Sequence, residues 1–302
     1  VAAAVEAAAN SFPAWWALPS LQRAAHLRAV ADVIRVNGRE LAEIETRDNG
    51  RVLNETLMGD IPACEQMFHF FAGAADKVHG DTVQVGPHSF NFTRREPHGV
   101  VAVIIPWNAP LSLMSSKVGA ALAAGNTVVI KAAEQAACSV LRWASLLESA
   151  GLPRGVVNVV AGLGEVAGDA LVCDSSIGRL TFTGSTETAR IIQDRGSSLI
   201  RPLHFELGGK SANIVFADAD LDAAIPVVVN AIVQNSGQTC SAGSRVLIQQ
   251  GIYEPLLKRL GEAFSRLQVG SAAMNLDLGP LIRASQLERV TGFLDQARAD
   301  GI

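Results

Sequence analysis

Apolar residues recur at helical spacing in the first quarter of the chain. Between Ser20 and Asp48 they alternate with charged residues, and a second stretch of this kind runs from about Ala63 to Ala75. This periodicity is typical of amphipathic helices that cover a core with one face. The sequence therefore predicts that helices precede the first strand.

Residues 79–96 break this helical pattern. Strand-forming residues stand on both sides of the pair Gly86-Pro87, which predicts a β-hairpin. A hairpin placed before an α/β region often protrudes and pairs subunits. A surface hairpin with no partner is an equally good interpretation at this point.

From Gly99 onward, continuous apolar runs alternate with helical stretches. The runs are "GVVAVIIPW", "NTVVIKAAE", "GVVNVVAG" and "IGRLTFTGS". Strands buried on both faces and separated by helices indicate a doubly wound parallel sheet. After "HFELGGKS" a strand, a helix, a strand and a helix follow. The predicted fold class is α/β, with a first domain over residues 1–207, which carries the hairpin, and a second, incomplete α/β domain over residues 208–302.

Composition and charge narrow the classes of protein. The 302 residues are 49% hydrophobic and 18% charged, with a net charge of −4, as in soluble globular domains. No basic block suggests nucleic acid or an anionic membrane, and no apolar run reaches the roughly 20 residues of a membrane span. The start of the chain lacks the basic region of a signal peptide.

The four cysteines bear on compartment and metal. None of them forms a CxxC pair and no histidine cluster accompanies them, which argues against a zinc site or a disulfide framework. We expect no metal, and a reducing cytoplasm fits best.

Two glycine-containing segments follow predicted strands, where ligands of open parallel sheets bind. In "FTGSTE", Gly184 permits a tight turn and Ser185 begins a helix whose free N–H groups could hold a phosphate. An ordinary N-cap with Glu187 as a capping-box residue is the alternative. "GLGEVAG" has one residue more than the dinucleotide fingerprint GxGxxG, so it is a weak signal.

Charged and amide side chains at other strand ends suggest further contacts. Lys131 and Glu134 follow a strand and could hydrogen-bond the hydroxyls of a ribose, or they could form a solvated ion pair. Glu206 lies in an apolar strand, where burial would raise its pKa toward that of a general base, unless it pairs with Lys210. Asn108 offers an N–H₂ group to an oxyanion, although a simple turn amide is commoner.

Cys240 stands in "QNSGQTCSAGSR", among small and hydrogen-bonding residues. A core thiol needs apolar neighbours, whereas a nucleophilic thiol needs access and nearby N–H groups. This setting favours a nucleophile.

Five segments in register resemble the aldehyde dehydrogenase superfamily: "PWNAPLSL", "KAAE", "FTGSTE", "FELGGKS" and "GQTCSAGSR". The match runs from about Ser11 to the last residue. The resemblance implies oxidation of an aldehyde to a carboxylic acid with NAD. It makes Cys240 the nucleophile and Glu206 the general base, while Asn108 and the backbone N–H of Cys240 form the oxyanion hole.

The resemblance also implies a cofactor site in the first domain. Its expected residues are Ile104, Ile105, Pro106, Trp107, Lys131, Glu134, Gly164, Gly168, Phe182, Gly184, Ser185 and Leu207. A carboxylate on the ribose hydroxyls would repel a 2′-phosphate, so Glu134 favours NAD, with NADP as a possible second cofactor. The family also implies a homodimer or homotetramer.

The sequence departs from the family in two ways. Ala132 follows Lys131, where relatives usually have proline, and Thr239 precedes the nucleophile, at a position that lines the substrate entrance in the family. The chain also lacks the E-x-F-G-P motif and about the last third of a family member, so we expect the 302-residue chain alone to be inactive or nearly so.

Three other functions are alternatives to aldehyde oxidation. A CoA-acylating relative usually lacks the glutamate at position 206. A cysteine hydrolase would pair Cys240 with His204 as base, but would leave the strand-end motifs unexplained. A non-catalytic protein that keeps the fold is the third alternative.

Overall fold

The computed structural model describes residues 1–302, which form two compact units. Unit 1 contains Val1–Ala42 and Leu57–Leu207, and unit 2 contains Glu43–Thr56 and Gly208–Ile302. Residues 43–56 were expected in the first domain, over residues 1–207, whereas they pack with unit 2. The cause is a long-range contact, because the carboxylate of Glu55 accepts hydrogen bonds from the backbone N–H of Asn235 at 2.9 and 3.2 Å.

Unit 1 is built on a five-stranded sheet whose strands are all parallel, in the order β5-β4-β3-β6-β7. The strands are β3 (Val100–Ile104), β4 (Thr127–Lys131), β5 (Val157–Val160), β6 (Ile177–Gly184) and β7 (Leu203–Leu207). Every residue of β3 and β4 is buried. The predicted doubly wound parallel sheet is confirmed.

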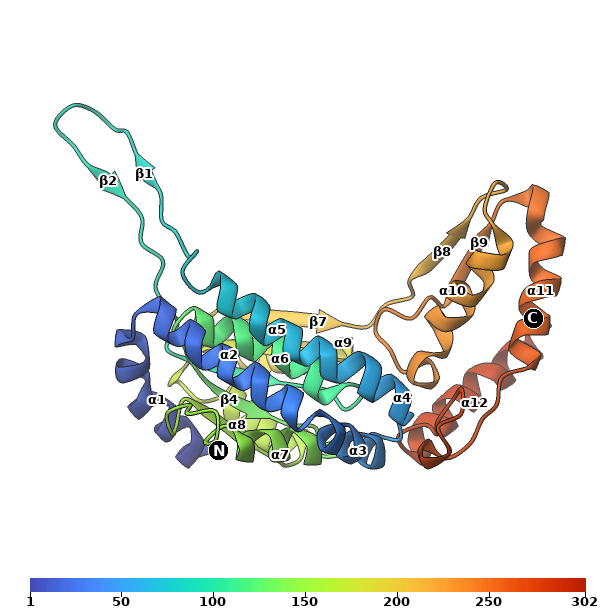
Figure 1. Cartoon of the computed structure of the whole chain (residues 1–302), viewed down its shortest axis with the longest axis horizontal. Coiled ribbons are helices and arrows are strands. Elements are labelled where there is room, and N and C mark those ends of the chain that lie inside the picture. Colours follow the sequence, from blue (N-terminus) through green and yellow to red (C-terminus); the bar gives the residue numbers. More distant parts are fainter. The chain divides into compact units, whose positions relative to one another are not determined.

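Helices cover both faces of this sheet (Figure 1). On one face α6 (Pro110–Ala123) and α7 (Cys138–Leu146) contact the strands, and α2 (Ser20–Val36) and α5 (Ile61–Ala74) pack outside α6. The other face carries α1 (Ala2–Ala17), α8 (Asp169–Val172) and α9 (Thr186–Arg195). These three helices share one apolar cluster with side chains of β3, β4 and β6.

Helix α1 was not predicted from the sequence. Its alanine-rich stretch has little contrast between faces, yet Val5, Ala8 and Trp15 are buried. One hydrogen bond ties the helix to α6 and another ties it to β4: Trp15 Nε1 donates to the carbonyl of Leu122 at 3.3 Å, and Thr127 Oγ1 donates to that of Ala8 at 2.9 Å.

The order of the strands identifies a topological switch point. The chain runs outward from β3 through β4 to β5, then returns to the other side of β3 for β6 and β7. In open α/β sheets, ligands bind beyond the carboxyl ends of the two strands at which the order reverses. Here those strands are β3 and β6.

The hairpin predicted for residues 79–96 is present, with shorter strands than its sequence suggested. Strand β1 (Thr82–Val83) pairs antiparallel with β2 (Asn91–Phe92), and Thr82 lies opposite Phe92. All four strand residues are exposed.

Unit 2 contains a parallel pair of strands, β8 (Ala212–Val215) and β9 (Arg245–Ile248), joined through helix α10 (Leu221–Val233). Helix α11 (Tyr253–Ser265) packs on α10, and the shared core consists of Val215, Ile225, Val228, Val229, Leu256 and Leu260. Asp220 is the N-cap of α10, and its carboxylate accepts from the N–H of Asp222 at 2.9 Å.

Short elements and one long helix complete the chain. They are α3 (Gly38–Asn49), α4 (Leu53–Glu55), the π-helices η1 (Thr56–Asp60) and η2 (Gly164–Gly168), the 3-10 turns η3 (Gln234–Gly237), η4 (Gln250–Ile252) and η5 (Ala272–Met274), and α12 (Ala284–Ala299). None of the helices combines the length and apolar character needed to cross a bilayer.

Candidate active site

The register of the sheet brings several predicted cofactor residues to one edge. Ile104 at the end of β3 pairs with Lys131 on one side and with Phe182 on the other. Gly184 at the end of β6 pairs in turn with Leu207. Residues separated by up to about a hundred positions in the chain therefore emerge together at the switch point.

The segment after β3 turns directly into helix α6. Ile105 is buried and its N–H donates to the carbonyl of Lys131 at 3.2 Å, which continues the pairing with β4. Pro106, Trp107 and Asn108 are half-buried. Pro110 then occupies the first turn of α6, a position where a missing N–H costs nothing.

Lys131 and Glu134 form an ion pair at the end of β4. Lys131 Nζ lies 2.9 Å from Glu134 Oε2, and the lysine side chain is only 4% exposed, against 33% for the glutamate. The alternative of a solvated pair is therefore wrong for the lysine. Burial acts to raise the pKa of Glu134. The hydrogen bond from Lys131 lowers it, as do a hydrogen bond from the glutamate's own backbone N–H and the positive charge of the lysine, and the resulting pKa lies below its ordinary value.

Gly184 is required by packing rather than by its backbone angles. A Cβ atom at this position would lie 2.4 Å from Cζ of Phe182, whose ring covers the glycine. Ser185 is the N-cap of α9, and its side chain accepts from the N–H of Thr188 at 3.1 Å. The alternative of an ordinary N-cap is therefore present at Ser185, but its capping box is not, because Thr188 and not Glu187 occupies the third helical position.

The "GLGEVAG" segment forms a single π-helical turn, η2, followed by the four-residue helix α8. Gly162 has φ +151°, which favours glycine, whereas a Cβ at Gly164 would meet no atom within 4 Å. Gly168 is buried. The long helix that follows a dinucleotide fingerprint is absent here, consistent with the weak match of its spacing.

Glu206 is exposed, contrary to the prediction that its strand would bury it. Strand β7 lies at the edge of the sheet and alternates between half-buried and exposed residues. The side chain of Glu206 is 58% exposed, and its Oε1 lies 3.0 Å from His204 Nε2. Lys210, the alternative partner, belongs to unit 2, where its Nζ donates to the carbonyl of Gly209 at 3.1 Å.

Cys240 lies in unit 2, in a turn that follows α10, and its thiol is exposed. The chain reaches it through Asn235 and Ser236, which have φ of 49° and 55°. Such left-handed non-glycine residues are uncommon and cluster at functional sites. Gln238 stabilises the bend, since its Nε2 donates to the carbonyl of Asn235 at 3.0 Å and its Oε1 accepts from the N–H of Ile282 at 3.0 Å.

Two glycines on either side of Cys240, Gly237 and Gly243, have a local structural reason. Gly237 has φ +78°, and a Cβ at Gly243 would lie 2.3 Å from the side-chain nitrogen of Asn213. Gly209, of the "ELGGKS" segment, lies against the turn, where a Cβ would be 3.4 Å from the carbonyl oxygen of Cys240. Glu206 and Asn108 belong to unit 1.

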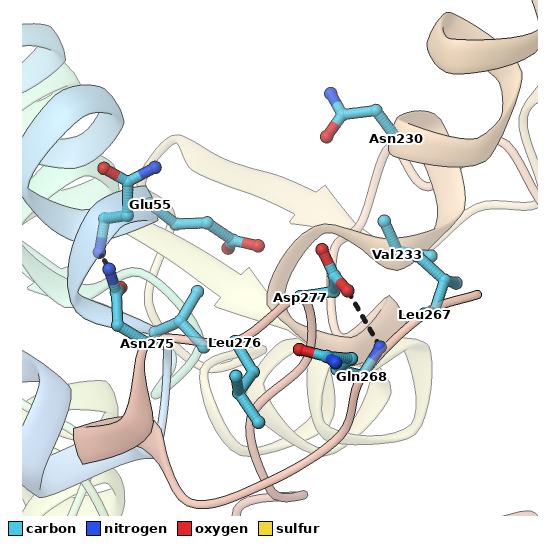
Figure 2. A pocket seen from close by; sticks show the side chains of 10 residues that line it. Glu55, Asn230, Val233, Leu267, Gln268, Asn275, Leu276 and Asp277 are labelled. Atoms are coloured by element: carbon cyan, nitrogen blue, oxygen red, sulfur yellow. Dashed lines mark hydrogen bonds between the residues drawn. The ribbon is translucent and has the colours of Figure 1, made fainter.

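Unit 2 also contains a pocket of about 370 Å³ (Figure 2). Its rim is ordered by two side-chain acceptors: Asn275 Oδ1 accepts from the N–H of Asn54 at 2.7 Å and Asp277 Oδ2 from that of Gln268 at 2.8 Å. The lining residues are Val52, Asn54, Glu55, Asn230, Val233, Leu267, Gln268, Asn275, Leu276 and Asp277. None of the predicted site residues is among them, and no group of histidine, cysteine or acidic side chains in the chain could hold a metal ion.

Comparison with known proteins identifies the family. The model of the aldehyde dehydrogenase family matches residues 1–302. A betaine aldehyde dehydrogenase from Cereibacter sphaeroides is 41% identical over 302 residues, which are 100% of this chain and 62% of that protein. The chain belongs to the aldehyde dehydrogenase family.

Solved structures support the same assignment. An NAD⁺ complex of aldehyde dehydrogenase from Bacillus cereus matches with a TM-score of 0.96 and 40% identity, over 99% of this chain and 61% of that one. An NADP-dependent enzyme from E. coli matches with a TM-score of 0.95 and 35% identity, over 99% of this chain and 62% of that one. The chain thus spans about three-fifths of the length of these relatives.

Sequence reasoning missed two contacts. The role of Glu55 in holding the bend at Asn235 carries no local signal, because the two residues are 180 positions apart. The contact between His204 and Glu206 could have been predicted from the sequence, since residues two apart in a strand share a face.

Proposed function

We propose that the whole protein oxidises an aldehyde to a carboxylic acid with NAD. The observation that carries the proposal is the register at the switch point, where Ile104 pairs with both Lys131 and Phe182. Those pairings gather residues of three separate cofactor motifs at one edge of a doubly wound sheet. The exposed thiol of Cys240, in a strained turn next to Gly209, supports the covalent part of the reaction.

The residues at the switch point fit a dinucleotide. Lys131 and Glu134 together present an ammonium donor and a carboxylate acceptor, the pair needed to hold two ribose hydroxyls. The first turn of α9, after Ser185, provides N–H groups suited to a phosphate. The carboxylate of Glu134 would repel a 2′-phosphate, so we propose NAD as the main cofactor. NAD, when bound, accepts the hydride from the substrate carbon.

The chain's own groups would perform the remaining steps. The thiolate of Cys240 attacks the aldehyde carbon and forms a C–S bond, and negative charge develops on the former carbonyl oxygen. The side-chain N–H₂ of Asn108 and the backbone N–H of Cys240 would stabilise that charge, with about 3–4 kcal/mol for one such donor. Loss of hydride leaves a thioester on Cys240.

Hydrolysis of the thioester requires a base. Glu206 would take a proton from water while the water oxygen bonds to the thioester carbon. The C–S bond then breaks, Cys240 leaves as the thiolate and the carboxylic acid is released. A hydroxyl ion at neutral pH is too dilute for this step, so a positioned carboxylate is the physical requirement. A thiol used in this way must stay reduced, and we place the protein in the cytoplasm for that reason.

Two measurements test the proposal. The first is calorimetric titration of the 302-residue chain with NAD, for which we expect saturable binding that Lys131→Met with Glu134→Gln weakens at least tenfold. The second is NADH formation by the whole protein with propanal, which should vanish in Cys240→Ala. The 302-residue chain alone should form little or no NADH. An active Cys240→Ala variant would refute the assignment of the nucleophile.

We further propose that the hairpin pairs two copies of the chain, giving a homodimer or a homotetramer. Its apolar side chains are strongly exposed, with Phe90 at 78% and Phe92 at 61%. Sedimentation velocity should give an assembly for the wild type and a monomer for the double variant Phe90→Ser/Phe92→Ser. The control Ile200→Ser, at another exposed apolar residue, should leave the assembly intact. A monomeric wild type would contradict the proposal.

A further inference from the structure

Glu206 shares one face of strand β7 with His204, and the two side chains are in contact. The distance from His204 Nε2 to Glu206 Oε1 is 3.0 Å. On the neighbouring strand β6 the register places Thr181 opposite His204 and Thr183 opposite Glu206. The contact follows from strand alternation, which places residues two apart on one face. The residues of β6 opposite the pair are both threonines, and Arg179, two residues before Thr181, is the titratable side chain of that strand.

The chemistry of the two groups fixes the direction of the hydrogen bond. An ionised carboxylate has only acceptor sites, and a neutral imidazole has one donor nitrogen and one acceptor nitrogen. Nε2 of His204 must carry the proton for a hydrogen bond to exist at this distance. The imidazole thus donates a hydrogen bond to Oε1, and Oε2 of Glu206 stays available to take a proton from water.

Glu206 has few other restraints on its position. Its side chain is 58% exposed, so packing does not select one rotamer. The hydroxyl of Thr183, on the neighbouring strand, makes no hydrogen bond. A free glutamate side chain samples many rotamers, and holding it in one costs conformational entropy. His204 supplies the contact that lowers this cost.

We propose that His204 is a positioning residue for Glu206 in hydrolysis of the thioester. The inference rests on the proposed role of Glu206 as general base. His204 holds Oε1, and Oε2 takes a proton from water while the water oxygen bonds to the thioester carbon. The C–S bond then breaks and Cys240 leaves as the thiolate. His204 exchanges no proton in this step, so a side chain with a donor at the same distance from the backbone can replace it.

Two substitutions separate this role from a merely structural one. In His204→Gln the amide nitrogen lies at the same distance along the side chain as Nε2, whereas in His204→Asn it lies at the distance of Nδ1 and falls short of Glu206. The two variants have the same functional group and differ by one methylene. His88→Ala, at an exposed residue of the hairpin, is the control for loss of a histidine elsewhere.

The assay uses the whole protein with NAD and propanal, in a rapid acid quench that follows NADH and propionate separately. For His204→Asn we expect propionate release to slow about five- to tenfold, with the NADH burst within twofold of the wild type. His204→Gln and His88→Ala should stay within twofold in both phases. Equal propionate release by wild type and Asn variant would overturn the proposal, as would slow release by the Gln variant.

A second readout requires no turnover. In the 302-residue chain, the ¹³C chemical shift of the Glu206 carboxyl carbon should change in His204→Asn and stay nearly unchanged in His204→Gln. Identical shifts in all three proteins would overturn the contact itself. If the wild type forms no NADH while the shift behaves as expected, the proposed function fails and the contact between His204 and Glu206 stands.

Discussion

Removing the charge of Glu134 should destabilise unit 1 more than removing the charge of Lys131. The two partners differ in burial, since the lysine side chain is 4% exposed and the glutamate 33%. Glu134→Gln leaves an ammonium without a counter-charge inside the protein. Lys131→Met removes that ammonium and leaves a carboxylate that water reaches and that still accepts from Gln135 Nε2 at 2.7 Å.

The separation of the charges sets the magnitude. At 2.9 Å and an effective dielectric constant of about 20, the attraction is about 6 kcal/mol. Dehydration of the ammonium cancels much of it, and water at the exposed part of Glu134 weakens it further. We expect Glu134→Gln to cost about 2 kcal/mol of unfolding free energy and Lys131→Met to cost less than about 1 kcal/mol. The double variant should resemble Lys131→Met.

Thermal unfolding followed by tryptophan fluorescence measures this directly, because all four tryptophans belong to unit 1. A loss of about 2 kcal/mol corresponds to a Tm lower by about 4–8 °C in a unit of this size. The pH dependence gives a second check. The pKa of Glu134 is lowered in the folded state, so its stabilisation is present above the unfolded pKa and is lost as pH falls through the folded pKa. The gap between wild type and Glu134→Gln should therefore close in acid.

The reasoning would be refuted if Lys131→Met proved the more damaging of the two substitutions. It would equally fail if the double variant lost the sum of the two single effects, since the cost of Glu134→Gln depends on the ammonium that Lys131→Met removes.

Two further predictions concern other site residues. Gly184→Ala should cost about 1–3 kcal/mol in thermal unfolding because its Cβ would overlap the Phe182 ring at 2.4 Å, whereas Gly164→Ala, with nothing within 4 Å, should cost little; equal losses would contradict the packing argument. In the native 302-residue chain, Ellman's reagent should label three thiols promptly and the buried Cys64 only after unfolding, and Cys240→Ala should reduce the prompt count by one without changing the Tm. Slow labelling of Cys240 would contradict its exposure.

The sheet of unit 1 could be predicted from the sequence because burial on both faces produces continuous apolar runs, such as those that became β3 and β4. The motifs at strand ends were also placed correctly along the chain. Whether these motifs meet at one edge depends on the strand order, and hydrophobic periodicity alone does not give that order. The alternation of strands and helices nevertheless favours a parallel sheet, in which strand ends of this kind lie at one edge.

The exposure of Glu206 could not be predicted, because the sequence of a short strand with apolar residues does not show whether that strand lies at the centre or at the edge of a sheet. Whether β7 is an edge strand is a property of the topology. The membership of residues 43–56 in unit 2 was likewise hidden, since it depends on the contact of Glu55 with Asn235. Helix α1 was missed because alanine gives little contrast between buried and exposed faces.

The most direct test of the account is to trap the covalent intermediate. The Glu206→Gln variant of the whole protein, mixed with NAD and propanal and quenched in acid, should carry a propionyl group on the peptide that contains Cys240, as measured by mass spectrometry. The acyl group should be absent when NAD is omitted. Acylation of another cysteine, or acylation that does not require NAD, would contradict the account.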